Sequence, residues 1–201
     1  MTTTEPQPAA KKPTRQHRLS TLLIVFVCVI PCSLAGWWSY CSRTPPSDED
    51  LRARFREHSA QFLRLRSMIL EEPAVSSVGD DNVGDFWLDR GEWTTHEPPY
   101  RSLTQAEMLQ AVGLAQGRYQ EYLDLLDAVG AYRVTKRSNG EMTVCIFRSG
   151  LVSSGINKNV VYSPHPPPSM VTNTDSYVAG KHKATVYAEL GEGWYIEHQR
   201  H

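Results

Sequence analysis

Residues 21–38 read TLLIVFVCVIPCSLAGWW, and no side chain in this stretch carries a charge. The uncharged region extends on both sides, over residues 19–42. An α-helix rises about 1.5 Å per residue, so a helix of this length spans a hydrocarbon core of about 30 Å. We therefore predict a transmembrane anchor at residues 19–42. It divides the chain into a short tail, residues 1–18, and one domain, residues 43–201.

The same stretch also has features of a cleaved signal peptide. Ser33 and Ala35 are small residues of the kind that a signal peptidase reads, and they follow a short apolar run. Against cleavage, Trp37, Trp38 and Tyr40 are aromatic residues placed where the outer interface of a spanning helix would fall. We expect a retained anchor, with secretion after cleavage near Ala35 as the alternative.

Basic residues before the apolar stretch predict its orientation. Lys11, Lys12, Arg15 and Arg18 precede it, and positive charge favours the cytoplasmic side. The tail contains few large apolar residues, so we expect it to be disordered in the cytoplasm. The localisation predicted is therefore a single-pass membrane protein whose domain is periplasmic or extracellular.

The composition of the domain limits its partners. Residues 43–201 hold 17 Lys and Arg against 21 Asp and Glu, a net formal charge of −4. Nucleic-acid binding requires a basic surface, so we expect no nucleic-acid partner. The four cysteines lack the paired spacing of a zinc site, and we expect neither a metal nor a cofactor.

Two long helices are predicted from apolar residues at alternating spacings of three and four. The first covers residues 48–71, with Ser47 as its N-cap and His58 as the one polar residue in its stripe. The second begins at a capping box formed by Thr104 and Glu107, and Gly130 ends it.

The residues after Gly130 alternate in the manner of β-strands. We expect strands at residues 131–137, 141–148, 159–162, 183–190 and 194–198. The fold class predicted is α+β, with two long helices packed on an antiparallel meander of about five strands.

The region between the two helices, residues 72–101, shows no clear period, and long loops are often functional. One hypothesis is that the loop at residues 78–100 binds a basic protein partner, because it combines aromatic and acidic residues. The alternative is that Trp87 and Trp93 are core residues that cover the helix pair. The candidate binding residues are Trp87, Trp93, Tyr100, Asp85 and Asp89.

Catalytic motifs are not evident. No Gly-x-Ser-x-Gly motif occurs, and His96-Glu97 lacks the second histidine of a zinc-protease helix. We name no catalytic residue and predict a membrane-anchored, extracytoplasmic, non-catalytic binding domain. The alternative is a small envelope hydrolase that uses the acidic, aromatic loop at residues 78–100.

Overall fold

The computed structural model describes residues 44–95, 98, 100–137, 139–151, 154–178 and 183–201. Within them, ten strands form one antiparallel sheet in the order β5-β4-β3-β2-β1-β6-β7-β8-β10-β9. The strands are β1 (Ser77–Gly79), β2 (Asn82–Val83), β3 (Phe86–Asp89), β4 (Glu92–Thr95), β5 (Ser102–Leu103), β6 (Arg133–Lys136), β7 (Met142–Leu151), β8 (Ser154–Tyr162), β9 (Ala184–Gly191) and β10 (Trp194–Arg200).

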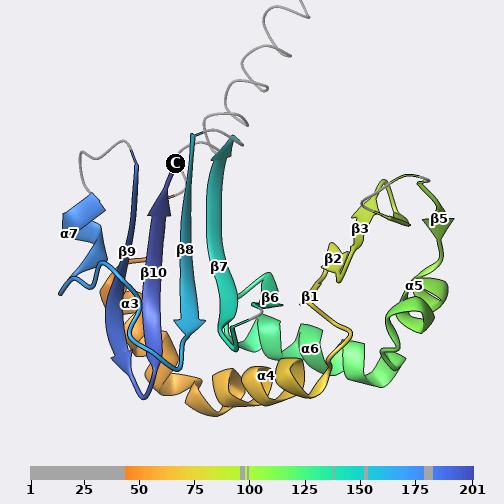
Figure 1. The fold of residues 1–201 in the computed structure, drawn as a ribbon, viewed down its shortest axis with the longest axis horizontal. Helices are drawn as coiled ribbons and strands as arrows, with labels where there is room; N and C mark the ends of the chain where they lie inside the picture. Colours follow the sequence, from red (N-terminus) through yellow and green to blue (C-terminus); the bar gives the residue numbers. More distant parts are fainter. Residues whose placement is uncertain (1–43, 96–97, 99, 138, 152–153, 179–182) are drawn as a thin grey trace, which may run out of the picture. The chain divides into compact units, whose positions relative to one another are not determined.

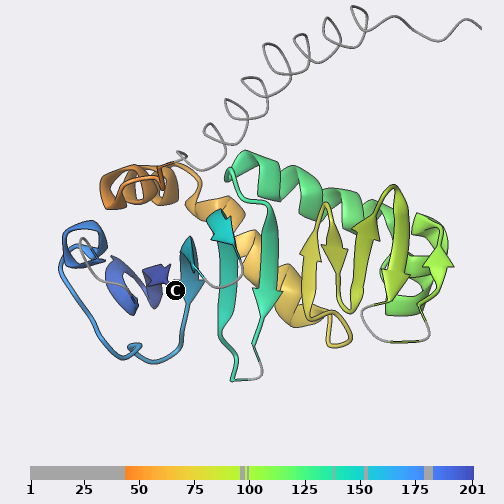
Figure 2. The same cartoon turned by 90° about the horizontal axis from the view of Figure 1, so that it is seen from above.

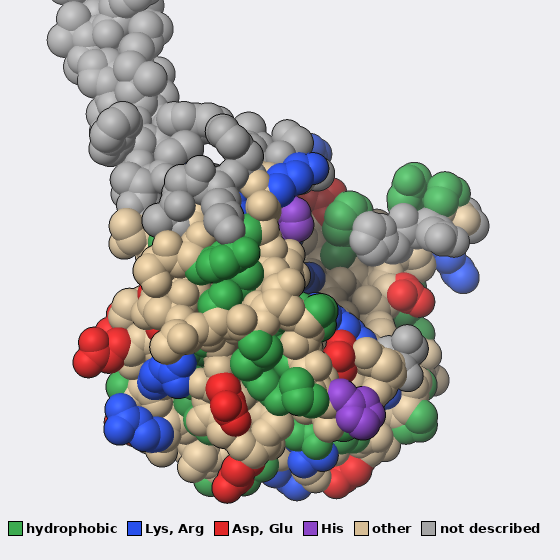
Figure 3. Space-filling model, turned by 60° about the vertical axis from the view of Figure 1, so that its left-hand side comes forward, with side chains coloured by type: hydrophobic (Ala, Val, Ile, Leu, Met, Phe, Trp, Pro, Cys, Tyr) green, Lys and Arg blue, Asp and Glu red, His purple; other side chains and the backbone are tan. Residues whose placement is uncertain are grey.

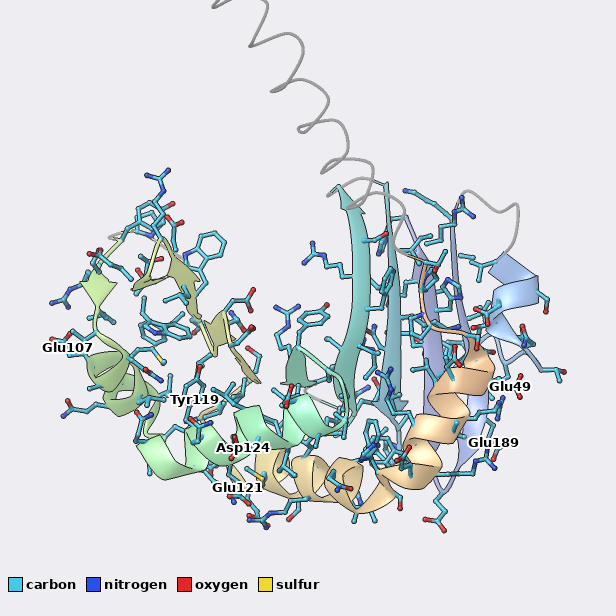
Figure 4. The ribbon with its side chains drawn as sticks, turned by 180° about the vertical axis from the view of Figure 1, so that it is seen from behind. Glu49, Glu107, Tyr119, Glu121, Asp124 and Glu189 are labelled. Atoms are coloured by element: carbon cyan, nitrogen blue, oxygen red, sulfur yellow. The ribbon has the colours of Figure 1, made fainter. Side chains whose placement is uncertain are left out.

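Five helices accompany the sheet in the described residues, and all are short. They are α3 (Asp48–Glu57), α4 (Ser59–Glu71), α5 (Gln105–Val112), α6 (Gln116–Ala128) and α7 (Thr174–Val178). Figures 1 and 2 show α4 and α6 along one side of the sheet. From behind, α3 lies in front of β9 and β10 (Figure 4), where Leu51 of α3 packs against Ala188 and Ile196.

The main core lies between α4, α6 and one face of the central strands. Val134, Val144 and Val160 face one another across β6, β7 and β8 and are completely buried. Phe62 of α4 and Tyr122 of α6 belong to the same apolar cluster. In Figure 4, Glu121 and Asp124 lie on the side of α6 away from the strands. The helices therefore cover the apolar face of the sheet and leave its other face to the polar residues of each strand.

The sheet is strongly curved. Strands β7 to β10 and strands β2 to β4 rise on either side of β1 and β6 (Figure 1). Figure 3 shows the surface hollowed beside a projecting part, with charged side chains at the margin of the hollow. The face without helices is thus the concave face, and it carries the candidate site described below.

The α+β fold predicted from the sequence, with two long helices on a five-stranded meander, is wrong. Strands β6 to β10 lie close to the predicted strand positions, but the sheet contains five further strands. These are β1 to β4, in the region interpreted as an irregular loop, and β5, directly after it. They are two to four residues long, too short for an alternating pattern to be recognised.

The predicted long helices are each divided in two. The first is interrupted at His58, whose ψ of 25° and φ of −114° separate α3 from α4. The second is interrupted at Gly113, which adopts the left-handed conformation with φ 71° and ends α5. An interrupted helix can keep the spacing of its apolar stripe, so the pattern alone did not reveal the breaks. The N-cap predicted at Ser47 and the capping box predicted at Thr104 are present, and Ser47 also forms a capping box with Asp50.

The membrane assignment also needs correction. None of the helices in the described residues has the length and apolar character needed to cross a membrane. The structure therefore does not support the single-pass anchor, and the predicted localisation that depended on it is withdrawn. The stretch at residues 19–42, with its alternative cleavage near Ala35, lies outside the described residues.

Candidate functional site

A row of polar side chains crosses the concave face of the sheet, one from each of five adjacent strands. Strand register places each of them directly opposite the next. The row consists of Arg133, Cys145, Asn159, Glu197 and Tyr187. The row lies on the opposite face of the sheet from the core residues Val134, Val144 and Val160, because successive residues of a strand point to opposite faces. The sheet therefore assembles these five groups from segments that are far apart in sequence.

Glu197 is the centre of a hydrogen-bonded network within this row. Its side chain is fully buried. The Tyr187 hydroxyl donates to Oε1 at 2.9 Å, and the Asn159 amide donates to Oε2 at 2.8 Å. The Arg137 guanidinium lies 3.5 Å from Oε1. A buried carboxylate is stable only when it is paired and hydrogen-bonded, and these three partners satisfy Glu197 from within the protein.

A depression of about 190 Å³ opens over this row. Its walls contain three guanidinium groups, those of Arg133, Arg137 and Arg148. Glu197 is the one carboxylate in its lining, and it is already paired with Arg137. Arg133 and Arg148 are left as an excess of positive charge, although residues 43–201 are acidic as a whole. We call this feature, with its lining, the polar depression.

Three buried polar atoms in the polar depression have no hydrogen-bond partner within the described residues. They are Arg133 Nε, Thr143 Oγ1 and Asn159 Oδ1. Only two further buried side-chain atoms of the described residues share this property, Arg66 Nε and Tyr122 OH. Thr143 is 5% exposed and Asn159 is 6% exposed. Because unpaired buried polar groups are rare and costly, their concentration in one depression indicates that they serve a ligand.

The thiol and phenol groups in and beside the polar depression keep their protons at neutral pH. Burial raises the pKa of the Cys145 thiol, and the neighbouring Arg133 guanidinium offsets this only in part. Burial likewise raises the pKa of Tyr132 to about 12, and burial next to Glu197 raises that of Tyr187 to about 12. A protonated thiol is a poor nucleophile. These groups are therefore suited to hydrogen bonding rather than to nucleophilic attack.

A second polar cluster lies on the helix-covered side of the sheet. Lys158 is fully buried, with its Nζ 2.8 Å from Asp48 Oδ1 and 2.5 Å from Asp175 Oδ1. Thr174 donates to Asp48 from its backbone and its hydroxyl, at 2.7 and 2.6 Å. His198 Nδ1 lies 3.3 Å from the Thr174 hydroxyl. This cluster joins α3 and α7 to β8 and β10, and its internal pairing gives it a structural role.

The residues predicted to bind a partner do not converge on one site. Trp93 is 5% exposed and belongs to the core. Trp87 is 43% exposed and Tyr100 is 68% exposed. Asp85 lies in the turn before β3, Asp89 at the end of β3, and both are exposed. The structure brings only Trp87 and Asp89 together, two positions apart and therefore on one face of β3.

Sequence reasoning missed the polar depression although part of its signal is local. Arg133 and Thr135 flank the buried Val134, and Asn157 and Asn159 flank the buried Lys158. This pattern indicates polar residues on one face of each strand, but it does not show which strands are neighbours. No group of His, Cys, Asp and Glu side chains in the described ranges is arranged to hold a metal ion.

Comparison with known proteins gives no further guide to the site. No protein-family model matches the chain, and neither the curated proteins nor the solved structures include a match. The function must therefore be argued from the polar depression itself.

Proposed function

We propose that residues 44–201 form a non-catalytic binding domain that holds a small anionic ligand in the polar depression. The observation that carries the proposal is the coincidence of unpartnered buried polar atoms with unneutralised guanidinium groups. Guanidinium groups form the strongest hydrogen bonds of proteins with carboxylates and phosphates. An anion would neutralise Arg133 and Arg148 and accept a hydrogen bond from the Thr143 hydroxyl.

The size of the depression limits the ligand. Pockets for drug-sized molecules measure about 300–1,000 Å³, whereas this one measures about 190 Å³. At about 30 Å³ for each molecule of liquid water, it has room for roughly six waters. This volume suits a small carboxylate or an inorganic anion better than a nucleotide.

The chemistry of the lining supports binding without catalysis. The Cys145 thiol is kept protonated by burial, and the Glu197 carboxylate is held by Tyr187 and Asn159. A general base needs a free lone pair close to its substrate, and these contacts occupy both carboxylate oxygens. The lining thus offers charge and hydrogen bonds but no activated group.

A titration of the full-length protein with propionate or inorganic phosphate, followed by backbone amide shifts in NMR spectra, tests the proposal. We expect saturable shifts at Thr143, Cys145 and Asn159. Arg133→Gln and Arg148→Gln should each weaken binding by about tenfold or more, because a hydrogen bond to a charged group contributes roughly 1.5–3 kcal/mol.

Arg101→Gln provides the matched control, since Arg101 is exposed and lies outside the lining. This variant loses the same charge and should bind both anions as the wild type does. The proposal fails if neither anion causes saturable shifts, or if Arg101→Gln weakens binding as much as Arg133→Gln.

A protein partner is a second candidate, favoured by the exposure of Trp87, at 43%. Asp85 and Asp89 are exposed beside it, so the partner would be basic and its binding would weaken as salt rises. Because Trp87 is opposite Asn82 and Thr94, it lies on the same sheet face as the polar depression. The alternative of a hydrolase acting through residues 78–100 stays a prediction, which this arrangement does not favour.

A further inference from the structure

The polar depression has two chemically different sides, and this difference defines the ligand more closely. Arg133 and Arg148 supply hydrogen-bond donors and positive charge on β6 and β7. Asn159 supplies an unpartnered oxygen acceptor on β8, and Glu197 supplies negative charge on β10. An anion alone would satisfy the first side only. The following inference rests on the proposed function and concerns what the second side recognises.

The orientation of the Asn159 amide can be assigned from its partner. A carboxylate accepts hydrogen bonds and does not donate them, so the amide nitrogen must face Glu197 Oε2, 2.8 Å away. The other amide atom, Oδ1, is then turned from Glu197. It is buried and has no partner within the described residues. Since a carbonyl oxygen can only accept, the group that satisfies it must carry an N–H or O–H.

The spacing of the two sides is short. Arg133 and Asn159 occupy the same row, with Cys145 between them. Neighbouring strands are about 4.8 Å apart, so the two backbones are separated by about 10 Å. The Arg133 side chain extends into this interval. The anionic group and the donor of a ligand that meets both residues must therefore be close together.

We infer that the ligand is a small acid with a hydrogen-bond donor on the carbon next to its carboxylate, namely a 2-hydroxy acid or a 2-amino acid. Its carboxylate accepts from Arg133, Arg148 and Thr143, and its hydroxyl or ammonium group donates to Asn159 Oδ1. The nearby Glu197 carboxylate favours the donor end of the ligand, while the guanidinium groups favour the acid end. Such a ligand satisfies the unpartnered atoms on both sides of the depression.

A series of ligands that differ in one group tests this inference on the full-length protein. Propionate, lactate and alanine share the same three-carbon skeleton and carboxylate, and only the last two carry the donor. We expect lactate and alanine to bind about tenfold more tightly than propionate in the same NMR titration, because they satisfy an otherwise unpaired buried acceptor.

The variant Asn159→Ala should reduce the ratio of lactate to propionate affinity to about one, because it removes the acceptor that distinguishes the two acids. Asn157→Ala is the matched control. It removes an amide that also lines the depression but contacts Gln199 at 3.5 Å, and it should preserve the ratio. If Asn159→Ala does not fold, the ratio of lactate to propionate affinity in the wild-type protein still tests the inference.

The outcomes separate this inference from the proposed function. Propionate and lactate binding with equal affinity, in a manner that depends on Arg133, would overturn the inference and leave the anion site standing. Absence of saturable binding by all three acids, and by inorganic phosphate, would remove the anion site as well. If the ratio of lactate to propionate affinity is unchanged in Asn159→Ala, another group accepts the hydrogen bond from the ligand's donor. This result would overturn the role assigned to Asn159.

Discussion

At the scale of single residues, the polar depression contains side chains that lower the free energy of unfolding, because they are buried without a hydrogen-bond partner in the described residues. Thr143 is nearly completely buried, yet its hydroxyl has no hydrogen-bond partner in the described residues. Leaving such a group unpaired costs about 1–3 kcal/mol. On the opposite face of β7 the neighbouring residue is Val144, a buried core residue that has no polar side-chain group to leave unpaired. The contrast indicates that the concave face has requirements other than packing.

Thr143→Val tests this cost directly. Valine has nearly the shape of threonine and has no polar group to desolvate, so the free energy of unfolding should rise by about 1 kcal/mol. Urea denaturation at neutral pH measures it. Thr135→Val, at a half-buried position on the same face, should change stability by less. A loss of stability in Thr143→Val would show that its hydroxyl already has a partner, and would remove one of the observations behind the anion site.

At the scale of elements, prediction from the sequence succeeded where the signal was local. The N-cap at Ser47 and the capping box of Thr104 and Glu107 depend on residues close together in sequence, and both predictions are confirmed. Strands β6 to β10 also carry recognisable alternation. Strands β1 to β5 did not, because strands of two to four residues contain two periods of the alternation at most. Their apolar residues were therefore interpreted as loop residues, although Val78 and Val83 pair with each other in the core.

The hairpin of β3 and β4 separates the two tryptophans that the sequence grouped together. Trp93 faces the core, so Trp93→Ala should lower the free energy of unfolding by about 3–5 kcal/mol. Trp87 is on the opposite face and 43% exposed, so Trp87→Ala should cost about 1 kcal/mol or less. Thermal or urea unfolding of both variants measures the difference. Equal losses would show that Trp87 is a core residue and would remove the basis for a partner at this surface.

At the scale of the whole domain, the candidate site depends on strand order, which the sequence does not show. β1 pairs with β6 and β8 pairs with β10, and neither pair is joined by a short turn. Arg133, Asn159 and Glu197 become neighbours only through this order. Each of them could be recognised as a polar residue within a strand, but their convergence could not be predicted from spacing along the chain.

The same long-range pairing brings together the buried cluster that joins α3 and α7 to the sheet. Lys158, Asp48, Asp175 and Arg200 surround His198. Burial first, and then the positive charge of Lys158, lower the pKa of His198 below its ordinary value of 6.5. For Asp48, burial acts to raise the pKa, but the hydrogen bonds from Lys158 and Thr174 outweigh it, and the pKa is lowered from 3.8.

These shifts predict that the cluster contributes two losses of stability as the pH falls. Below about pH 6.5, the unfolded chain takes up a proton at His198 that the folded domain resists, so unfolding is favoured until the pH reaches the lower pKa of the folded state. A second loss begins below about pH 3.8, because Asp48 takes up its proton at a higher pH in the unfolded chain than in the folded domain. Free energies of unfolding between pH 8 and pH 5 isolate the first step.

His198→Gln should flatten this first step, because it removes the proton whose uptake differs between the two states. His165→Gln is the matched control, since His165 is exposed and its loss should leave the dependence on pH unchanged. The comparison uses the slope of the free energy of unfolding against pH. A general loss of stability caused by the glutamine does not change this slope. If the slope between pH 8 and pH 5 is the same in His198→Gln and in the wild type, then His198 is protonated as readily in the folded domain as in the unfolded chain, and the cluster does not act as we infer.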